Sequence, residues 1–94
     1  MRLLVLLVLL AGCDSPTPSM MGAERREVAR NGRNYVVYQT KDAFEVIRMG
    51  YARRGEHMQI RADMIDMIPV VTGCRIDEAS VQGDSGEFRG RLRC

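Results

Sequence analysis

The sequence has few of the residues that build catalytic and recognition sites. Its 94 residues include no tryptophan, one histidine, three tyrosines and two phenylalanines. The scattered tyrosines predict no aromatic platform for a carbohydrate or a peptide. The net charge is only +2, without a concentrated basic face, which argues against a nucleic-acid binder. No P-loop, dinucleotide fingerprint or zinc-ligand pattern is present, so we predict no cofactor.

The sequence also lacks an apolar run long enough to span a bilayer, which needs about 20 residues. The longest run, LLVLLVLL, has eight residues and follows Met1 and Arg2. A positive start and a short apolar run are typical of a secretory signal peptide.

Two small residues and a cysteine follow this run. Leu10-Ala11-Gly12-Cys13 resembles the lipobox of bacterial lipoproteins. The resemblance implies that residues 1–12 are removed and that Cys13 is acylated, so that membrane lipid is a partner of the chain. It implies a lipid-anchored protein facing the periplasm. Asp14 resembles the signal that retains such proteins in the inner membrane of enteric bacteria.

Residues 13–23 are polar, with Pro16 and Pro18, and they predict a flexible tether. Residues 24–94 are predicted to form one small domain. Asn31-Gly32 is a preferred two-residue hairpin turn, so residues 24–30 should pair with residues 33–40. Residues 44–49 predict a third antiparallel strand.

The apolar period changes after the third strand, where five residues form one helical stripe: Ile60, Met64, Met67, Ile68 and Val71. We expect a helix from about Gly55 to Ile68, because Pro69 disfavours helical geometry at the residue before it. Residues 74–81 and 87–94 predict two more strands. The fold class is therefore α+β, in the order βββαββ, with the helix on one face of an antiparallel sheet.

The second and third cysteines form an even pair in an oxidising compartment. Cys74 and Cys94 are equidistant from Asp84, the middle of a turn, so a symmetric hairpin places them opposite each other. We predict a disulfide between them. A two-cysteine metal site and free thiols are the alternatives. The same register puts Ile76 opposite Leu92, Asp77 opposite Arg91, and Ser80 opposite Phe88.

The segment Gly83-Asp84-Ser85-Gly86 resembles the GDSG motif of chymotrypsin-like serine proteases over four residues only. That chemistry needs a histidine base and an orienting carboxylate. His57 is the only histidine, and no family motif surrounds it. Because glycine, aspartate and serine are typical turn residues, we predict a hairpin loop and no enzyme.

Two other groups of residues have a functional and a structural interpretation. His57 with Met58, Met64 and Met67 could bind copper, although methionine at helical spacing is also ordinary core filler. The last strand carries a basic stripe, which consists of Arg89, Arg91 and Arg93. This stripe could bind anionic lipid or an acidic partner, or it could simply face solvent. We therefore expect a non-catalytic binding or structural role with an envelope protein as partner, and copper or small-ligand binding is the alternative.

Overall fold

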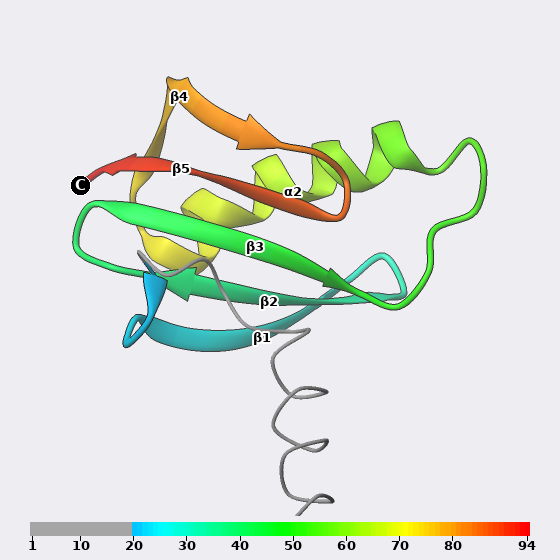
Figure 1. Cartoon of the computed structure of the whole chain (residues 1–94), viewed down its shortest axis with the longest axis horizontal. Helices are drawn as coiled ribbons and strands as arrows, with labels where there is room; N and C mark the ends of the chain where they lie inside the picture. The colour runs from blue at the N-terminus through cyan, green and yellow to red at the C-terminus, as the bar shows by residue number, and fades with distance from the viewer. Residues whose placement is uncertain (1–19) are drawn as a thin grey trace, which may run out of the picture.

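The computed structural model describes residues 20–94, which form a five-stranded sheet covered on one face by a helix (Figure 1). The elements are β1 (Glu24–Arg30), β2 (Arg33–Gln39), β3 (Ala43–Met49), α2 (His57–Thr72), β4 (Arg75–Gly83) and β5 (Glu87–Arg93). The predicted α+β class and the order βββαββ are confirmed.

All neighbouring strands of the sheet are antiparallel, in the order β1-β2-β3-β5-β4. The first hairpin turns at Asn31 and Gly32, whose φ values are 51° and 77°. Both values lie in the left-handed region that this turn needs. Val28 pairs with Tyr35, as the turn predicted.

The helix is longer at its carboxyl end than the sequence predicted. It continues through Pro69 to Thr72 and ends at Gly73, which is left-handed at φ 75° and donates its amide to the Pro69 carbonyl at 2.9 Å. Pro69 removes one helical hydrogen bond. Because Pro69 and Ile65 lie on the exposed side of α2, solvent can satisfy the carbonyl group that is left free. The predicted end at Ile68 was therefore wrong.

The main core lies between α2 and the covered face of the sheet. The predicted stripe supplies the helix side, and Ile60, Met64 and Ile68 are each fully buried. The sheet side of this core consists of Tyr35, Val37, Phe44, Val46, Phe88 and Leu92. These residues alternate along their strands, as the period of two requires.

A smaller apolar cluster lies on the opposite face of the sheet. Val36 and Tyr38 of β2 pack there with Met20, which is only 4% exposed. The packed part of the chain therefore begins before Glu24, inside the segment predicted as a tether.

The register of the last hairpin agrees with the prediction at one end and differs at the other. Ile76 lies opposite Leu92 and Asp77 opposite Arg91, as predicted. The register then shifts between Asp77 and Gln82, so that Gly83 pairs with Phe88. The expected Ser80–Phe88 pair was wrong. Ser80 Oγ instead accepts the amide of Arg91 at 2.8 Å and donates to the Asp77 carbonyl at 2.6 Å, which stabilises the bulge.

Candidate functional site

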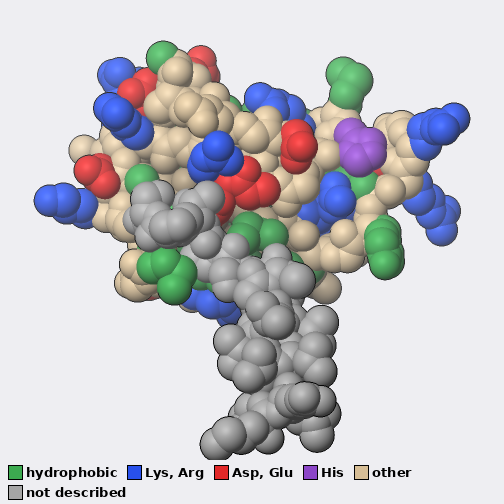
Figure 2. Space-filling view, in the orientation of Figure 1, with side chains coloured by type: hydrophobic (Ala, Val, Ile, Leu, Met, Phe, Trp, Pro, Cys, Tyr) green, Lys and Arg blue, Asp and Glu red, His purple; other side chains and the backbone are tan. Residues whose placement is uncertain are grey.

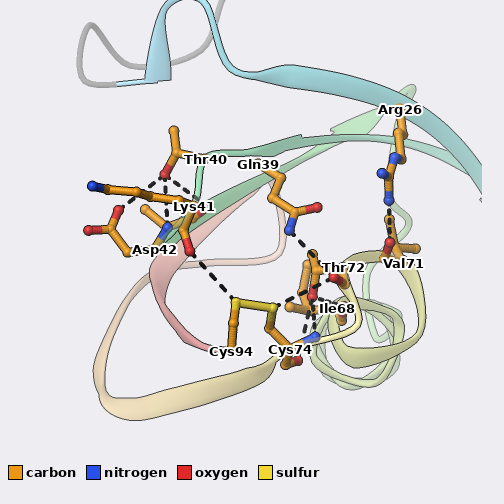
Figure 3. The surroundings of a disulfide bond; sticks show 11 residues. Arg26, Gln39, Thr40, Lys41, Asp42, Ile68, Val71, Thr72, Cys74 and Cys94 are labelled. Atoms are coloured by element: carbon orange, nitrogen blue, oxygen red, sulfur yellow. Dashed lines mark hydrogen bonds between the residues drawn. A yellow bond between two sulfur atoms is a disulfide. The ribbon is translucent and has the colours of Figure 1, made fainter.

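The predicted disulfide closes one end of the sheet (Figure 3). Cys74 and Cys94 are bonded, with their Cα atoms 4.5 Å apart. Cys74 is part of the core, whereas Cys94 is exposed and its Sγ lies 3.6 Å from the carbonyl oxygen of Lys41. The prediction is confirmed, and the bond fixes the last residue between the end of α2 and the turn before β3.

Side chains from two strands hold the carboxyl end of α2 beside the disulfide. Arg26 of β1 donates to the carbonyl of Val71, and Gln39 of β2 donates to that of Thr72 at 3.4 Å (Figure 3). Thr72 Oγ1 also accepts the amide of Cys74 at 3.1 Å. The last carbonyls of a helix lack partners within the helix and carry partial negative charge. The polar groups at this end are thus used to dock the helix on the sheet.

The turn between β4 and β5 is closed by its own aspartate. Asp84 Oδ1 accepts the amides of Gly86 at 2.8 Å and Glu87 at 3.3 Å. These hydrogen bonds favour the charged carboxylate and hold the pKa of Asp84 below its ordinary value. Arg48 of β3 donates to the carbonyl of Ser85 at 2.8 Å. The segment is a hairpin loop, as predicted, and it is fastened to β3.

The structure brings His57 and Ser85 together, although they lie 28 residues apart in the chain. Nδ1 of His57 and Oγ of Ser85 form a hydrogen bond at 2.5 Å. His57 is exposed in the first turn of α2, and Figure 2 shows the single histidine on the surface. Within residues 20–94, no carboxylate forms an ion pair with this imidazole. The hydrogen bond joins the start of the helix to the hairpin.

The arginines of the last strand lie on the face of the sheet that α2 leaves uncovered. Arg89 forms an ion pair with Glu87 at 2.6 Å, and Arg93 forms one with Asp77 at 3.6 Å. Arg91 is exposed. Figure 2 shows acidic and basic side chains interspersed over the visible face. Neighbouring carboxylates therefore offset two of the three charges in the basic stripe.

The residues of the copper alternative lie in different environments. Met64 and Met67 are 0% and 1% exposed in the core, whereas Met58 is 88% exposed. The structure therefore does not place all four side chains together at the surface. Among the residues that the structure describes, no group of three or more His, Cys, Asp or Glu side chains could hold a metal ion.

A buried carboxylate that the sequence did not indicate links the first turn to the helix. Asp63 is 2% exposed, and its Oδ1 accepts from Asn31 at 2.9 Å and from Gln59 at 3.0 Å. Arg30 Nε lies 4.0 Å from the same oxygen. Burial, together with the charge of Asp63, raises the pKa of the Tyr35 phenol. The helical pattern placed Asp63 outside the apolar stripe, so only the turn at Asn31 could have pointed to this contact.

Comparison with known proteins assigns no family to the chain. No protein-family model, curated protein or solved structure matches it. Cys13 and the predicted signal peptide lie outside the described residues. No helix within residues 20–94 has the length and apolar character needed to cross a membrane.

Proposed function

We propose that this chain is a lipid-anchored cell-envelope protein with a non-catalytic binding or structural role at the membrane surface. The observation that carries the proposal is the sequence Leu10-Ala11-Gly12-Cys13, which directly follows the eight-residue apolar run. This order of features is typical of a bacterial lipoprotein precursor.

The disulfide supports this proposal because it accounts for the other two cysteines. Cys74 and Cys94 are bonded to each other, which leaves Cys13 as the third cysteine of the chain. Disulfides form and persist in oxidising compartments such as the periplasm. A stapled domain behind a lipidated cysteine is consistent with a protein that folds after export.

Acylation of Cys13 would attach the domain firmly. Each buried CH₂ group contributes about 0.8 kcal/mol, and one myristoyl chain alone binds only marginally, so two or three chains give a stable anchor. Six residues separate Cys13 from Met20. At about 3.3 Å per residue, six residues reach at most roughly 20 Å, so an anchor at Cys13 would keep the domain close to the lipid surface.

The described surface favours binding over catalysis. The polar groups that could carry chemistry instead dock the helix and close the turns. Several large apolar side chains are exposed, including Tyr51 at 101%, Met58 at 88% and Val70 at 80%. Exposed apolar side chains are available to a partner, and we propose an envelope protein as that partner.

The anchor is tested by expressing the full chain in a bacterium supplied with labelled palmitate. We expect the wild-type protein to carry the label and to stay with the membranes in high salt. Cys13→Ser should abolish the label and leave an uncleaved or soluble form.

The matched control is the Cys74→Ser/Cys94→Ser double variant, which keeps Cys13 but loses the disulfide. It should incorporate palmitate as the wild type does, when the label is compared for equal amounts of recovered protein. A wild-type protein that washes off membranes with salt and carries no acyl mass would refute the proposal.

A further inference from the structure

The outer edge of β4 offers main-chain hydrogen-bonding groups at Ile76. β4 is the last strand of the sheet, so none of the strands the structure describes pairs with its outer side (Figure 1). Leu92, opposite Ile76, donates its amide at 2.8 Å to the carbonyl of Asp42, the residue just before β3. Leu92 therefore points its main-chain groups away from β4. In an antiparallel pair of this kind, the N–H and C=O of Ile76 also point away, toward the free edge.

The disulfide supports the same assignment. The Cα atoms of Cys74 and Cys94 lie 4.5 Å apart, which is typical of antiparallel residues that exchange no main-chain hydrogen bonds. Main-chain direction alternates along a strand, so Cys74 and Ile76 face the same edge. The amide of Cys74 is satisfied by Thr72, which leaves Ile76 as the outward-facing residue of this end of β4.

A groove of about 620 Å³ runs beside this edge, between β4 and α2. Its apolar wall consists of Ile65 and Pro69 from the helix and Ile76 from the strand. Ile65 is 39% exposed. The groove therefore combines an open strand edge with an apolar surface, and an extended chain can satisfy both at once.

The charges beside Ile76 indicate which extended chain fits. Arg75 and Asp77 flank Ile76 on the uncovered face of the sheet. Arg75 is exposed, and Asp77 also forms an ion pair at 3.6 Å with Arg93 of its own chain. In an antiparallel pair of two β4 strands centred on Ile76, each Arg75 lies opposite the Asp77 of the other copy. Cross-strand pairs of opposite charge are favourable.

We propose that two copies of this chain pair through their β4 edges, with Ile76 on the two-fold axis. The two Ile76 residues exchange both main-chain hydrogen bonds. Their side chains meet on the helix side, beside Ile65 of each copy. Arg75 of one copy faces Asp77 of the other, and symmetry repeats this contact.

A second copy fits the edge better than a peptide of one charge sign. The groove is lined by the basic residues Arg75 and Arg93 and by the acidic residues Asp66, Asp77 and Glu78. This mixture favours a partner that also carries both signs at matching positions. The register shift after Asp77 keeps the straight part of the edge short, which limits pairing to the residues around Ile76.

The symmetry suits attachment to one surface. The two-fold axis runs perpendicular to the sheet, so both helices lie on one face of the joined sheet. Met20 packs on the opposite face in each copy, so both chains enter from the same side. The pairing itself does not require the anchor.

The test uses two full-length copies with different carboxyl-terminal epitope tags, expressed together and extracted from membranes in mild detergent. One tag is captured and the other is measured. Wild-type copies should purify together. Arg75→Asp in both copies, or Asp77→Arg in both, should lower recovery about tenfold, because symmetry places two pairs of like charges opposite each other.

The decisive sample combines Arg75→Asp in one copy with Asp77→Arg in the other. In this mixed pair each acidic side chain again faces an arginine, so recovery should return to the wild-type level. Arg25→Asp is the matched control, because it reverses an exposed charge on the opposite edge strand and should change nothing. Thiol counting on each variant verifies that Cys74 and Cys94 remain bonded.

Separate purification of the wild-type copies would overturn the proposal. Failure of the mixed pair to recover, with both disulfides intact, would also overturn it. Pairing is measured in detergent, so the same experiment on Cys13→Ser separates the two proposals. Failure of the copies to pair would not bear on the lipid anchor. Failure of the anchor proposal would not bear on the pairing of the β4 edges.

Discussion

The two edge strands of the sheet, β1 and β4, are held by different interactions. β1 pairs with β2 over all seven of its residues without a break, and five of the seven are charged. Two ion pairs form within β1 itself, Arg25 with Glu27 and Arg26 with Glu24. β4 loses its register after Asp77 and is fastened by a covalent bond next to its first residue.

The difference indicates what each edge can do. Charged side chains along an exposed edge discourage another strand from adding to it, so β1 is a protected edge. β4 carries fewer charges, borders a groove whose lining includes Ile65, Pro69 and Ile76, and is held by the disulfide where its straight part lies. We infer that β1 is retained by its tight turn and continuous pairing, whereas β4 depends on the staple.

The largest expected effect comes from damage to the core that both edges share. Ile60 is fully buried on α2, and Ile60→Ala should lower the free energy of unfolding by about 2–5 kcal/mol. Hydrogen exchange should then speed up in β1 and β4 alike. Val70→Ala on the exposed side of the same helix should have little effect, and an Ile60→Ala protein that melts like wild type would show that the stripe is not core.

Removal of the disulfide should affect the two edge strands differently. Cys74→Ser/Cys94→Ser opens a bond between residues 20 positions apart, which is worth about 3 kcal/mol in the chain-entropy model. Amide exchange should increase more in β4 and β5 than in β1. Equal protection loss in both edges would contradict the comparison.

A change in the first turn should destabilise β1, the other edge strand. Gly32 has a φ of 77°, and no atom lies within 4 Å of the position that a Cβ would take, so Gly32→Ala meets only backbone strain. The left-handed conformation costs a residue with a Cβ about 1–2 kcal/mol. Exchange should rise mainly in β1 and β2, and a stability loss confined to β4 would contradict this assignment.

Acid should act on the second hairpin, with the smallest effect. The pKa of Asp84 is lowered in the folded state by the amides of Gly86 and Glu87. A carboxyl group with a depressed folded pKa stabilises the fold above its unfolded pKa, and this contribution is lost as pH falls through the folded pKa. Below about pH 4, the ordinary range of an aspartate, β5 should therefore loosen before β1. Asp84→Asn should remove this acid dependence, and an unchanged pH profile would assign it to another carboxyl group.

The sequence correctly predicted the features that follow from local patterns. Asn31-Gly32 set the first hairpin, the helical stripe identified the core, and the symmetric positions of Cys74 and Cys94 predicted their bond. Two features depended on tertiary contacts instead. Ser80 stabilises a bulge with main-chain groups that no local pattern reveals, and Asp63 is buried by its contact with a distant turn.

Pro69 shows the same limit at the helix end. Its local preference predicted an early stop, but the structure places it on the exposed side of α2 and lets Gly73 end the helix. The candidate site was predicted in part. The disulfide was found from the sequence, whereas the contact between His57 and Ser85 depends on how the second hairpin folds over the helix start.

The intact mass of the wild-type protein extracted from membranes tests the central claim most directly. An anchored, stapled domain should begin at Cys13, carry the mass of two or three acyl chains, and lack the two hydrogens lost in one disulfide. The mass of the complete 94-residue chain, 10.6 kDa without acyl groups, would contradict the account.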